Sequence, residues 1–129
     1  FFTRIFLESE IIKYNDKGIF YYRSGIGGLS SAASYKAYQS YYNTLFLSLN
    51  KALEHFQYEP TIQRACANMW QMFVYLTYPS CKSLLFKAEA EIERLGGSDI
   101  IFPAGGKTKI LCSLLGWKFT KRIKEKFQI

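Results

Sequence analysis

The chain has 129 residues, of which 49% are hydrophobic and 21% are charged. This length and composition fit one folded domain with a packed core and argue against an intrinsically disordered chain. The net charge is +7, and residues 107–129 hold most of it, because seven Lys or Arg stand there beside one Glu. The body of the chain is therefore nearly neutral, and the C-terminal tail is strongly basic.

Several classes of protein are disfavoured by the sequence. No stretch reaches the roughly 18 consecutive apolar residues of a membrane span. The first dozen residues do not form a signal peptide, because Glu8 and Glu10 interrupt the apolar run. Three widely separated cysteines offer neither a disulfide framework nor metal-ligand spacing (Cys66, Cys81 and Cys112). We therefore expect a reducing, cytoplasmic compartment.

The first 31 residues predict a short helix followed by a β-hairpin. Apolar residues recur at helical spacing within residues 1–12. Asn15, Asp16 and Gly18 are turn-forming residues, and they lie between two short apolar runs at 12–14 and 19–22. Because a lone two-stranded hairpin is marginally stable, we expect this segment to belong to a larger sheet outside the chain.

Three longer helices are predicted to follow. Ser30, Ser31 or Ser34 caps the first helix, which ends near Tyr58 because Pro60 disfavours helical geometry in the residue before it. The second runs from Pro60 to Pro79, and we assign six residues to its inner face (Ile62, Cys66, Met69, Trp70, Phe73 and Leu76). The third covers residues 80–95 and ends at two glycines. Short connections favour an antiparallel bundle, so the predicted fold is mainly α.

The basic tail is predicted to end in an amphipathic helix. Residues 108–115 are expected to be helical, Gly116 interrupts, and residues 118–127 alternate basic and apolar side chains. The candidate membrane-surface residues are the five cations and two aromatic residues of this helix (Lys118, Lys121, Arg122, Lys124, Lys126, Trp117 and Phe119). Such a pattern is typical of helices that lie on anionic bilayers.

Two other interpretations of the tail stay open. Its cations also suit nucleic-acid phosphates, and its apolar stripe also suits packing on the body of the protein. No recognition-helix or RNA-binding signature accompanies the basic residues, so we predict no nucleic-acid partner.

The sequence predicts no catalytic residue, metal site or cofactor within this chain. The stretch Gly105-Gly106-Lys107-Thr108 is not a phosphate loop, because Ile101 occupies the position of the first required glycine. His55 is the single histidine and has no catalytic partner nearby in the sequence. Glu89, Glu91 and Glu93 spread over one helix, and the two aspartates fall in separate loops without an Asp-X-Asp motif.

The most informative stretch follows the predicted hairpin. A short aromatic run ends in Tyr21-Tyr22-Arg23, passes through a turn rich in glycine, and reaches Leu29-Ser30-Ser31 before the long helix. In order and context, these residues resemble the C-terminal part of a bacterial family 2 glycosyltransferase of the inverting, GT-A type. The matching pieces are 2–12, 13–14, 19–23 and 28–31, with a looser match through the helices to Gly116-Trp117-Lys118-Phe119.

This resemblance implies that two parts of the chain have different roles. Residues 1–31 would be the end of a catalytic core, and residues 32–129 a helical C-terminal region with its basic tail at 107–129, together forming a single compact unit. The donor-sugar site, the divalent metal and the general base would all lie upstream, in a core that this chain lacks. The chain alone would then be inactive. Arg23 and Ser24 would be the substrate-binding candidates, unless Arg23 forms a salt bridge to the missing segment.

The implied function is part of the synthesis of cell-surface polysaccharide or lipopolysaccharide. The chain would be peripheral at the inner face of the cell membrane, where lipid-linked acceptors lie. The alternative is a self-contained helical module, without enzymatic activity, that binds a protein or a membrane surface. The long helix carries a tyrosine-rich face, and this face, if exposed, predicts a homodimer.

Overall fold

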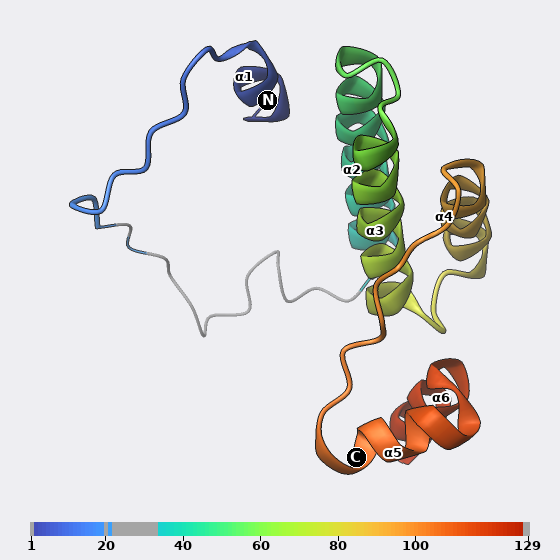
Figure 1. The fold of residues 1–129 in the computed structure, drawn as a ribbon. Helices are drawn as coiled ribbons and strands as arrows, with labels where there is room; N and C mark the ends of the chain where they lie inside the picture. The colour runs from blue at the N-terminus through green and yellow to red at the C-terminus, as the bar shows by residue number, and fades with distance from the viewer. Residues whose placement is uncertain (1, 20, 22–33, 128–129) are drawn as a thin grey trace. The chain divides into compact units, whose positions relative to one another are not determined.

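A computed structural model describes residues 2–19, 21 and 34–127 of the chain (Figure 1). These residues form six helices: α1 (Phe2–Glu8), α2 (Tyr35–His55), α3 (Pro60–Thr77), α4 (Lys82–Arg94), α5 (Gly106–Leu115) and α6 (Trp117–Phe127). The prediction of a mainly α fold is confirmed, and each of the three longer predicted helices is present.

The predicted β-hairpin is not supported by the described residues. A turn does form where it was expected, at Asp16 and Lys17, and the Asn15 side chain accepts a hydrogen bond from the Lys17 amide at 3.0 Å. However, residues 11–14, Ile19 and Tyr21 are exposed and form no strand. The physical reason is that two short strands are marginal alone, and the apolar residues of this segment have no sheet to cover them within the described chain.

Contacts between residues group the chain into two units, Phe1–Glu59 and Pro60–Ile129. The domain boundary predicted between residues 31 and 32 falls outside the described residues and stays a prediction. The antiparallel three-helix bundle also stays a prediction, because α2 belongs to the first unit, whereas α3 and α4 belong to the second.

The long helix α2 begins and ends for local reasons. Of the three serines predicted as caps, Ser34 is the one that lies within the described residues. Its hydroxyl accepts a hydrogen bond from the Ala37 amide at 3.2 Å, so Ser34 caps α2. The helix ends at His55, three residues before the predicted end. Gln57 and Tyr58 have φ values of 48° and 59°, in the left-handed region that terminates helices.

In the second unit, α3 and α4 form an antiparallel hairpin (Figure 1). Their contact buries a core of aromatic and aliphatic side chains, among them Trp70, Phe73, Val74, Leu84, Leu85 and Ala88. Two residues assigned to the inner face of α3, Met69 and Leu76, are exposed instead. Helix α4 starts at Lys82, two residues later than predicted, because Cys81 has a φ of 55° and cannot belong to the helix.

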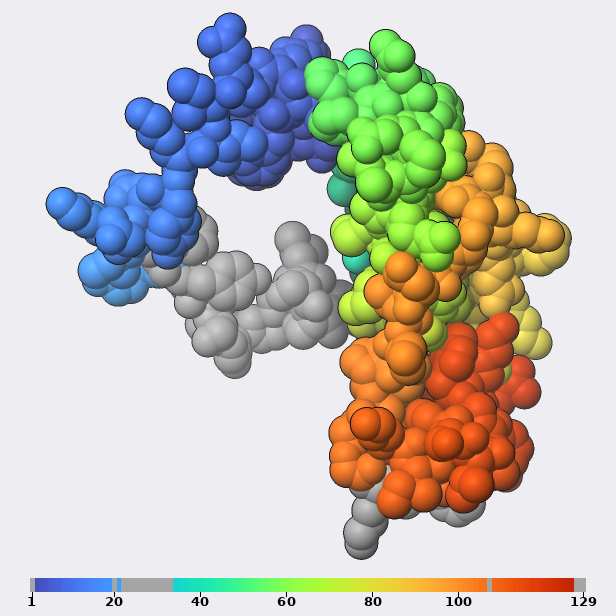
Figure 2. All heavy atoms as spheres, viewed as in Figure 1, coloured from blue at the N-terminus to red at the C-terminus, as the bar shows by residue number. Residues whose placement is uncertain are grey.

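The segment from Gly96 to Gly105 returns along α3 toward α5 (Figures 1 and 2). Gly96 and Gly97 end α4 with φ values of 85° and 88°, a geometry that favours glycine. The Asn68 side chain of α3 then holds the segment: its oxygen accepts from Ser98 Oγ at 2.7 Å and from the Asp99 amide at 3.2 Å, while its nitrogen donates to Asp99 Oδ1 at 2.8 Å. This segment therefore positions α5 and α6 near the C-terminal end of α3.

Candidate functional site

The substrate-binding candidates Arg23 and Ser24 lie outside the described residues, so their role stays a prediction. The candidate membrane-surface residues are all described, and all belong to α6. The structure brings part of this set into contact with α3 and α4, and leaves the other part on the surface.

Trp117, the first residue of α6, is the centre of an aromatic cluster. Its ring centroid lies 4.8 Å from that of Tyr75, 5.2 Å from that of Tyr78 and 5.5 Å from that of Phe102. Tyr75 meets Phe102 edge-on at 5.2 Å and donates its hydroxyl proton to the Ile100 carbonyl at 3.0 Å. The cluster thus joins α3, the 96–105 segment and α6, and such aromatic pairs are worth about 0.5–1.5 kcal/mol each beyond their buried area.

Three cations of α6 are directed toward α3 and α4. The Lys121 ammonium donates to the Tyr75 carbonyl at 2.5 Å and to the Leu76 carbonyl at 3.0 Å. These carbonyls lie in the last turn of α3, where helix geometry leaves them without intrahelical donors and where positive charge is favoured. Lys121 therefore caps α3 from another helix.

Lys118 and Arg122 both lie near the Tyr78 ring. Lys118 Nζ is 2.7 Å from Glu89 Oε1 of α4 and 5.8 Å from the Tyr78 ring centroid. The Arg122 guanidinium carbon is 5.3 Å from the same ring, within the range of cation–π attraction. The packing interpretation of the tail therefore accounts for Trp117, Lys118 and Lys121, and in part for Arg122.

Burial changes the acid–base properties at this junction. It lowers the pKa of Lys121, an effect that the nearby Glu125 carboxylate partly offsets. Burial also raises the pKa of the Tyr75 hydroxyl, which keeps it protonated as a donor to the Ile100 carbonyl. These shifts belong to a structural contact, because both groups are engaged with backbone carbonyls.

Helices α5 and α6 also carry exposed apolar side chains. Gly116, with a φ of 77°, separates the two helices, and the helices contact each other. Among the side chains of this pair that the structure describes, five large apolar ones are exposed: Ile110, Leu111, Leu114, Leu115 and Phe119. Leu114 is 75% exposed and Phe119 is 51% exposed. We call these five residues, with the exposed cations Lys109, Lys124 and Lys126, the α5–α6 surface.

An open groove of about 540 Å³ lies between the 100–104 segment, α5 and Trp117. Its lining is predominantly aliphatic and aromatic, and Lys109 and Cys112 lie at it. In the first unit, a second depression of about 290 Å³ is lined by residues of α1 and α2, including Arg4, Lys51 and His55. Arg4 is paired there with Glu8 at 3.2 Å, and the His55 ring packs edge-on against Phe56 at 4.8 Å.

Two absences concern the described residues alone. No group of three or more His, Cys, Asp or Glu in this part of the chain is placed to hold a metal ion. Likewise, none of the described helices is both long and apolar enough to cross a bilayer. The three cysteines Cys66, Cys81 and Cys112 are free, and burial raises the pKa of the Cys66 thiol against the opposing effect of Arg94.

Sequence reasoning missed the partners of the tail. Tyr75 lies in the last turn of a helix whose inner face was assigned by periodicity alone, and Tyr78 directly follows that helix. Glu89 was considered only among carboxylates that spread over one helix. The signal that points to them is chemical: a Trp beside two lysines and an arginine needs acceptors and aromatic faces.

A scan against protein-family models, a search of curated proteins and a search of solved structures each find no match to this chain.

Proposed function

We propose that this chain is a non-catalytic helical region whose α5–α6 surface attaches it to an anionic membrane. The observation that supports this proposal is the coincidence of exposed apolar residues with the charge of the chain. Leu114, Leu115 and Phe119 are exposed in the same segment, 107–129, that carries seven cations and one carboxylate. An apolar surface bordered by lysines is the chemistry that recognises an anionic bilayer.

The strength of membrane binding can be estimated from typical free energies of side-chain burial and charge attraction. Burial of an exposed Leu or Phe in lipid is worth about 1.5–3 kcal/mol, and a Lys near an anionic surface is worth about 1 kcal/mol. Two inserted side chains with Lys124 and Lys126 would then provide about 5–8 kcal/mol, which corresponds to a Kd between about 1 μM and 0.2 mM. The attachment is therefore reversible, as in a peripheral protein.

Part of the tail is unavailable for this role. Lys121 donates to carbonyls of α3, and Lys118 is paired with Glu89. Trp117 packs against Tyr75, Tyr78 and Phe102. The membrane-surface residues proposed here therefore differ from the predicted ones. Phe119, Lys124 and Lys126 are retained, and exposed apolar residues of α5 are added.

Hydrogen–deuterium exchange with and without anionic vesicles tests where the membrane binds. The proposal expects slower exchange in α5 and α6 when vesicles are added, and unchanged exchange in α2. Protection confined to α2 would place the lipid contact on another face and contradict the proposal. Protection of α5 and α6 that rises with protein concentration in the absence of lipid would contradict it too, because it would indicate self-association through the α5–α6 surface.

The resemblance to family 2 glycosyltransferases extends the proposal. On that basis the helical region would hold an upstream catalytic core near lipid-linked acceptors during the synthesis of cell-surface polysaccharide or lipopolysaccharide. The core would supply the donor-sugar site, the divalent metal and the general base. Arg23 and Ser24 would then contact donor phosphate or acceptor in the complete enzyme.

Calorimetric titration of the isolated chain with a nucleotide sugar and Mn²⁺ tests this extension. We expect no metal-dependent binding, because the donor site belongs to the missing core. Micromolar binding by this chain alone would refute the assignment as a C-terminal region. An upstream reading frame of catalytic-domain length with an Asp-X-Asp motif would support it.

A further inference from the structure

A second groove, of about 620 Å³, lies between α6, the start of α4 and the Tyr78–Pro79 turn. It is distinct from the α5–α6 surface, although both use residues of α6. Three cations line it, Lys82, Lys118 and Arg122, together with one carboxylate, Glu89. The lining therefore carries an excess of two positive charges.

The three cations of this groove differ in the interactions that they make within the chain. Lys118 is paired with Glu89 at 2.7 Å. Arg122 lies over the Tyr78 ring, which attracts its charge and leaves its N–H groups free to donate. Among the described residues, neither Arg122 nor Lys82 has a hydrogen-bond or ion-pair partner. Two cations on facing elements thus lack an anion.

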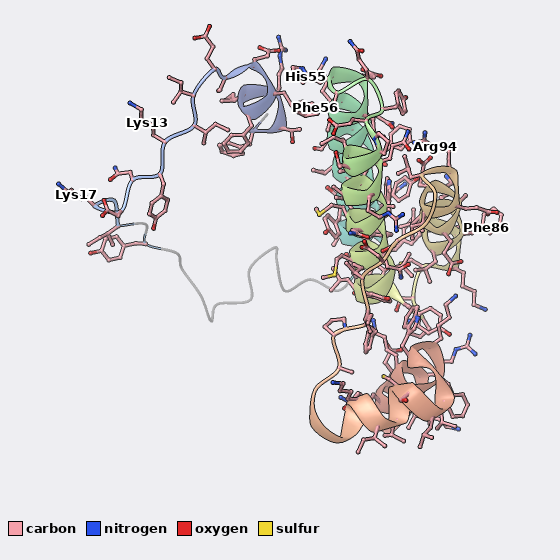
Figure 3. The ribbon with its side chains drawn as sticks, viewed as in Figure 1. Lys13, Lys17, His55, Phe56, Phe86 and Arg94 are labelled. Atoms are coloured by element: carbon pink, nitrogen blue, oxygen red, sulfur yellow. The ribbon has the colours of Figure 1, made fainter. Side chains whose placement is uncertain are left out.

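The groove also has an apolar side. Phe86 projects outward from α4 (Figure 3), is 76% exposed and lines the same groove as Arg122. Pro79 adds a second apolar surface beside it. A small inorganic anion would use the cations and leave Phe86 in water. An anion attached to an apolar group would use both, and this complementarity favours a lipid.

We propose that the groove between α4 and α6 binds the phosphate monoester headgroup of an anionic lipid, with Arg122 and Lys82 on the phosphate and Phe86 against the lipid backbone. The proposal deepens the proposed membrane attachment and rests on it. A monoester carries a charge of about −1.5 to −2 and three terminal oxygens, whereas a phosphodiester carries one charge and two terminal oxygens. Two cations, one with the planar fork of a guanidinium, therefore discriminate in favour of the monoester.

Vesicle co-sedimentation tests this selectivity. Two sets of phosphatidylcholine vesicles are matched in surface potential, one with phosphatidic acid, a monoester, and the other with phosphatidylglycerol, a diester. We expect the intact chain to bind the phosphatidic acid vesicles about three- to tenfold more tightly, the net effect of one additional ordinary hydrogen bond. Arg122→Gln and Lys82→Gln should each remove this preference while binding to phosphatidylglycerol remains.

Lys124→Gln is the matched control. It removes the same charge from the same helix at an exposed position outside the groove. It should weaken binding to both lipids equally and leave the preference intact. If Lys124→Gln and Arg122→Gln reduce binding to both lipids alike, the groove has no headgroup selectivity and the inference is overturned, while general membrane attachment stands.

Titration with short-chain phosphatidic acid below its micelle concentration separates the two proposals. Binding of this monomeric lipid that requires Arg122, without binding to any vesicle, would support the groove and refute membrane attachment. Displacement of the short-chain lipid by an equal concentration of inorganic phosphate would overturn the inference, because the site would then recognise phosphate without the lipid.

Discussion

The Lys121 ammonium of α6 donates to the Tyr75 carbonyl of α3 at 2.5 Å. This contact joins residues that are 46 positions apart in the chain and satisfies a carbonyl at the end of a helix. It also divides the basic tail into two parts. Lys121 and Lys118 serve the packing of α6, whereas Lys124 and Lys126 are exposed.

Lys121→Met removes the donor and keeps the apolar length of the side chain. We expect it to lower the free energy of unfolding by about 1–2 kcal/mol, because carbonyls of Tyr75 and Leu76 lose a charged donor. Lys124→Met on the exposed side of α6 should change it by less than about 0.5 kcal/mol. Urea unfolding followed by circular dichroism measures both, and equal effects would contradict the capping role.

The contribution of Lys121 should also depend on pH. Burial lowers the pKa of Lys121 below its ordinary value of 10.5, so the unfolded chain binds this proton more tightly than the folded chain. Between the lowered pKa and 10.5, the stability that Lys121 provides therefore rises with pH. The difference in unfolding free energy between wild type and Lys121→Met should therefore grow as the pH approaches 10.5 from below. A difference that shrinks over this range would contradict the buried position of the ammonium.

Asn68 should be important for the placement of the 96–105 segment. Asn68→Ala removes hydrogen bonds to Ser98 and to both the amide and the carboxylate of Asp99. We expect a loss of about 1–2 kcal/mol, less than the sum of three bonds because this site is partly exposed to water. Asn43→Ala, at an exposed position of α2, is the control and should be nearly neutral. Faster amide exchange at Asp99 and Ile100 in Asn68→Ala alone would confirm the role.

The sequence predicts the helices well, because their signals are local. Ser34 caps α2 through its hydroxyl, whereas Pro60 starts α3 and the pair Gly96-Gly97 ends α4 through backbone conformation. The hairpin prediction depended instead on a sheet outside the chain, and local turn chemistry at Asn15 does not supply one.

The candidate site was harder to predict, because it depends on contacts distant in sequence. Periodicity places Lys118 and Lys121 on a basic face, yet their acceptors, Glu89 and the Tyr75 carbonyl, are 29 and 46 residues away. A helical wheel describes which side chains share a face, and it cannot tell which face another helix covers. The packing interpretation therefore describes one part of α6, and the membrane interpretation stays a proposal for its exposed part.

Leu114 tests the apolar part of the α5–α6 surface. Leu114→Ser should weaken binding to anionic vesicles by at least about tenfold, because it removes a side chain whose burial is worth about 1.5–3 kcal/mol. Leu47→Ser on α2 is a matched control, since Leu47 is 70% exposed and Leu114 is 75% exposed. If both variants weaken vesicle binding equally, the α5–α6 surface is not the membrane-binding element.

The most direct test of the account is the partition of the intact chain onto vesicles as the fraction of anionic lipid increases. With Lys124 and Lys126 at the surface, we predict that binding to phosphatidylcholine is weak and rises steeply with phosphatidylglycerol content, and that added salt reverses the increase. Equal partition onto neutral and anionic vesicles, or no partition onto either, would contradict the central claim that α5 and α6 attach this chain to an anionic membrane.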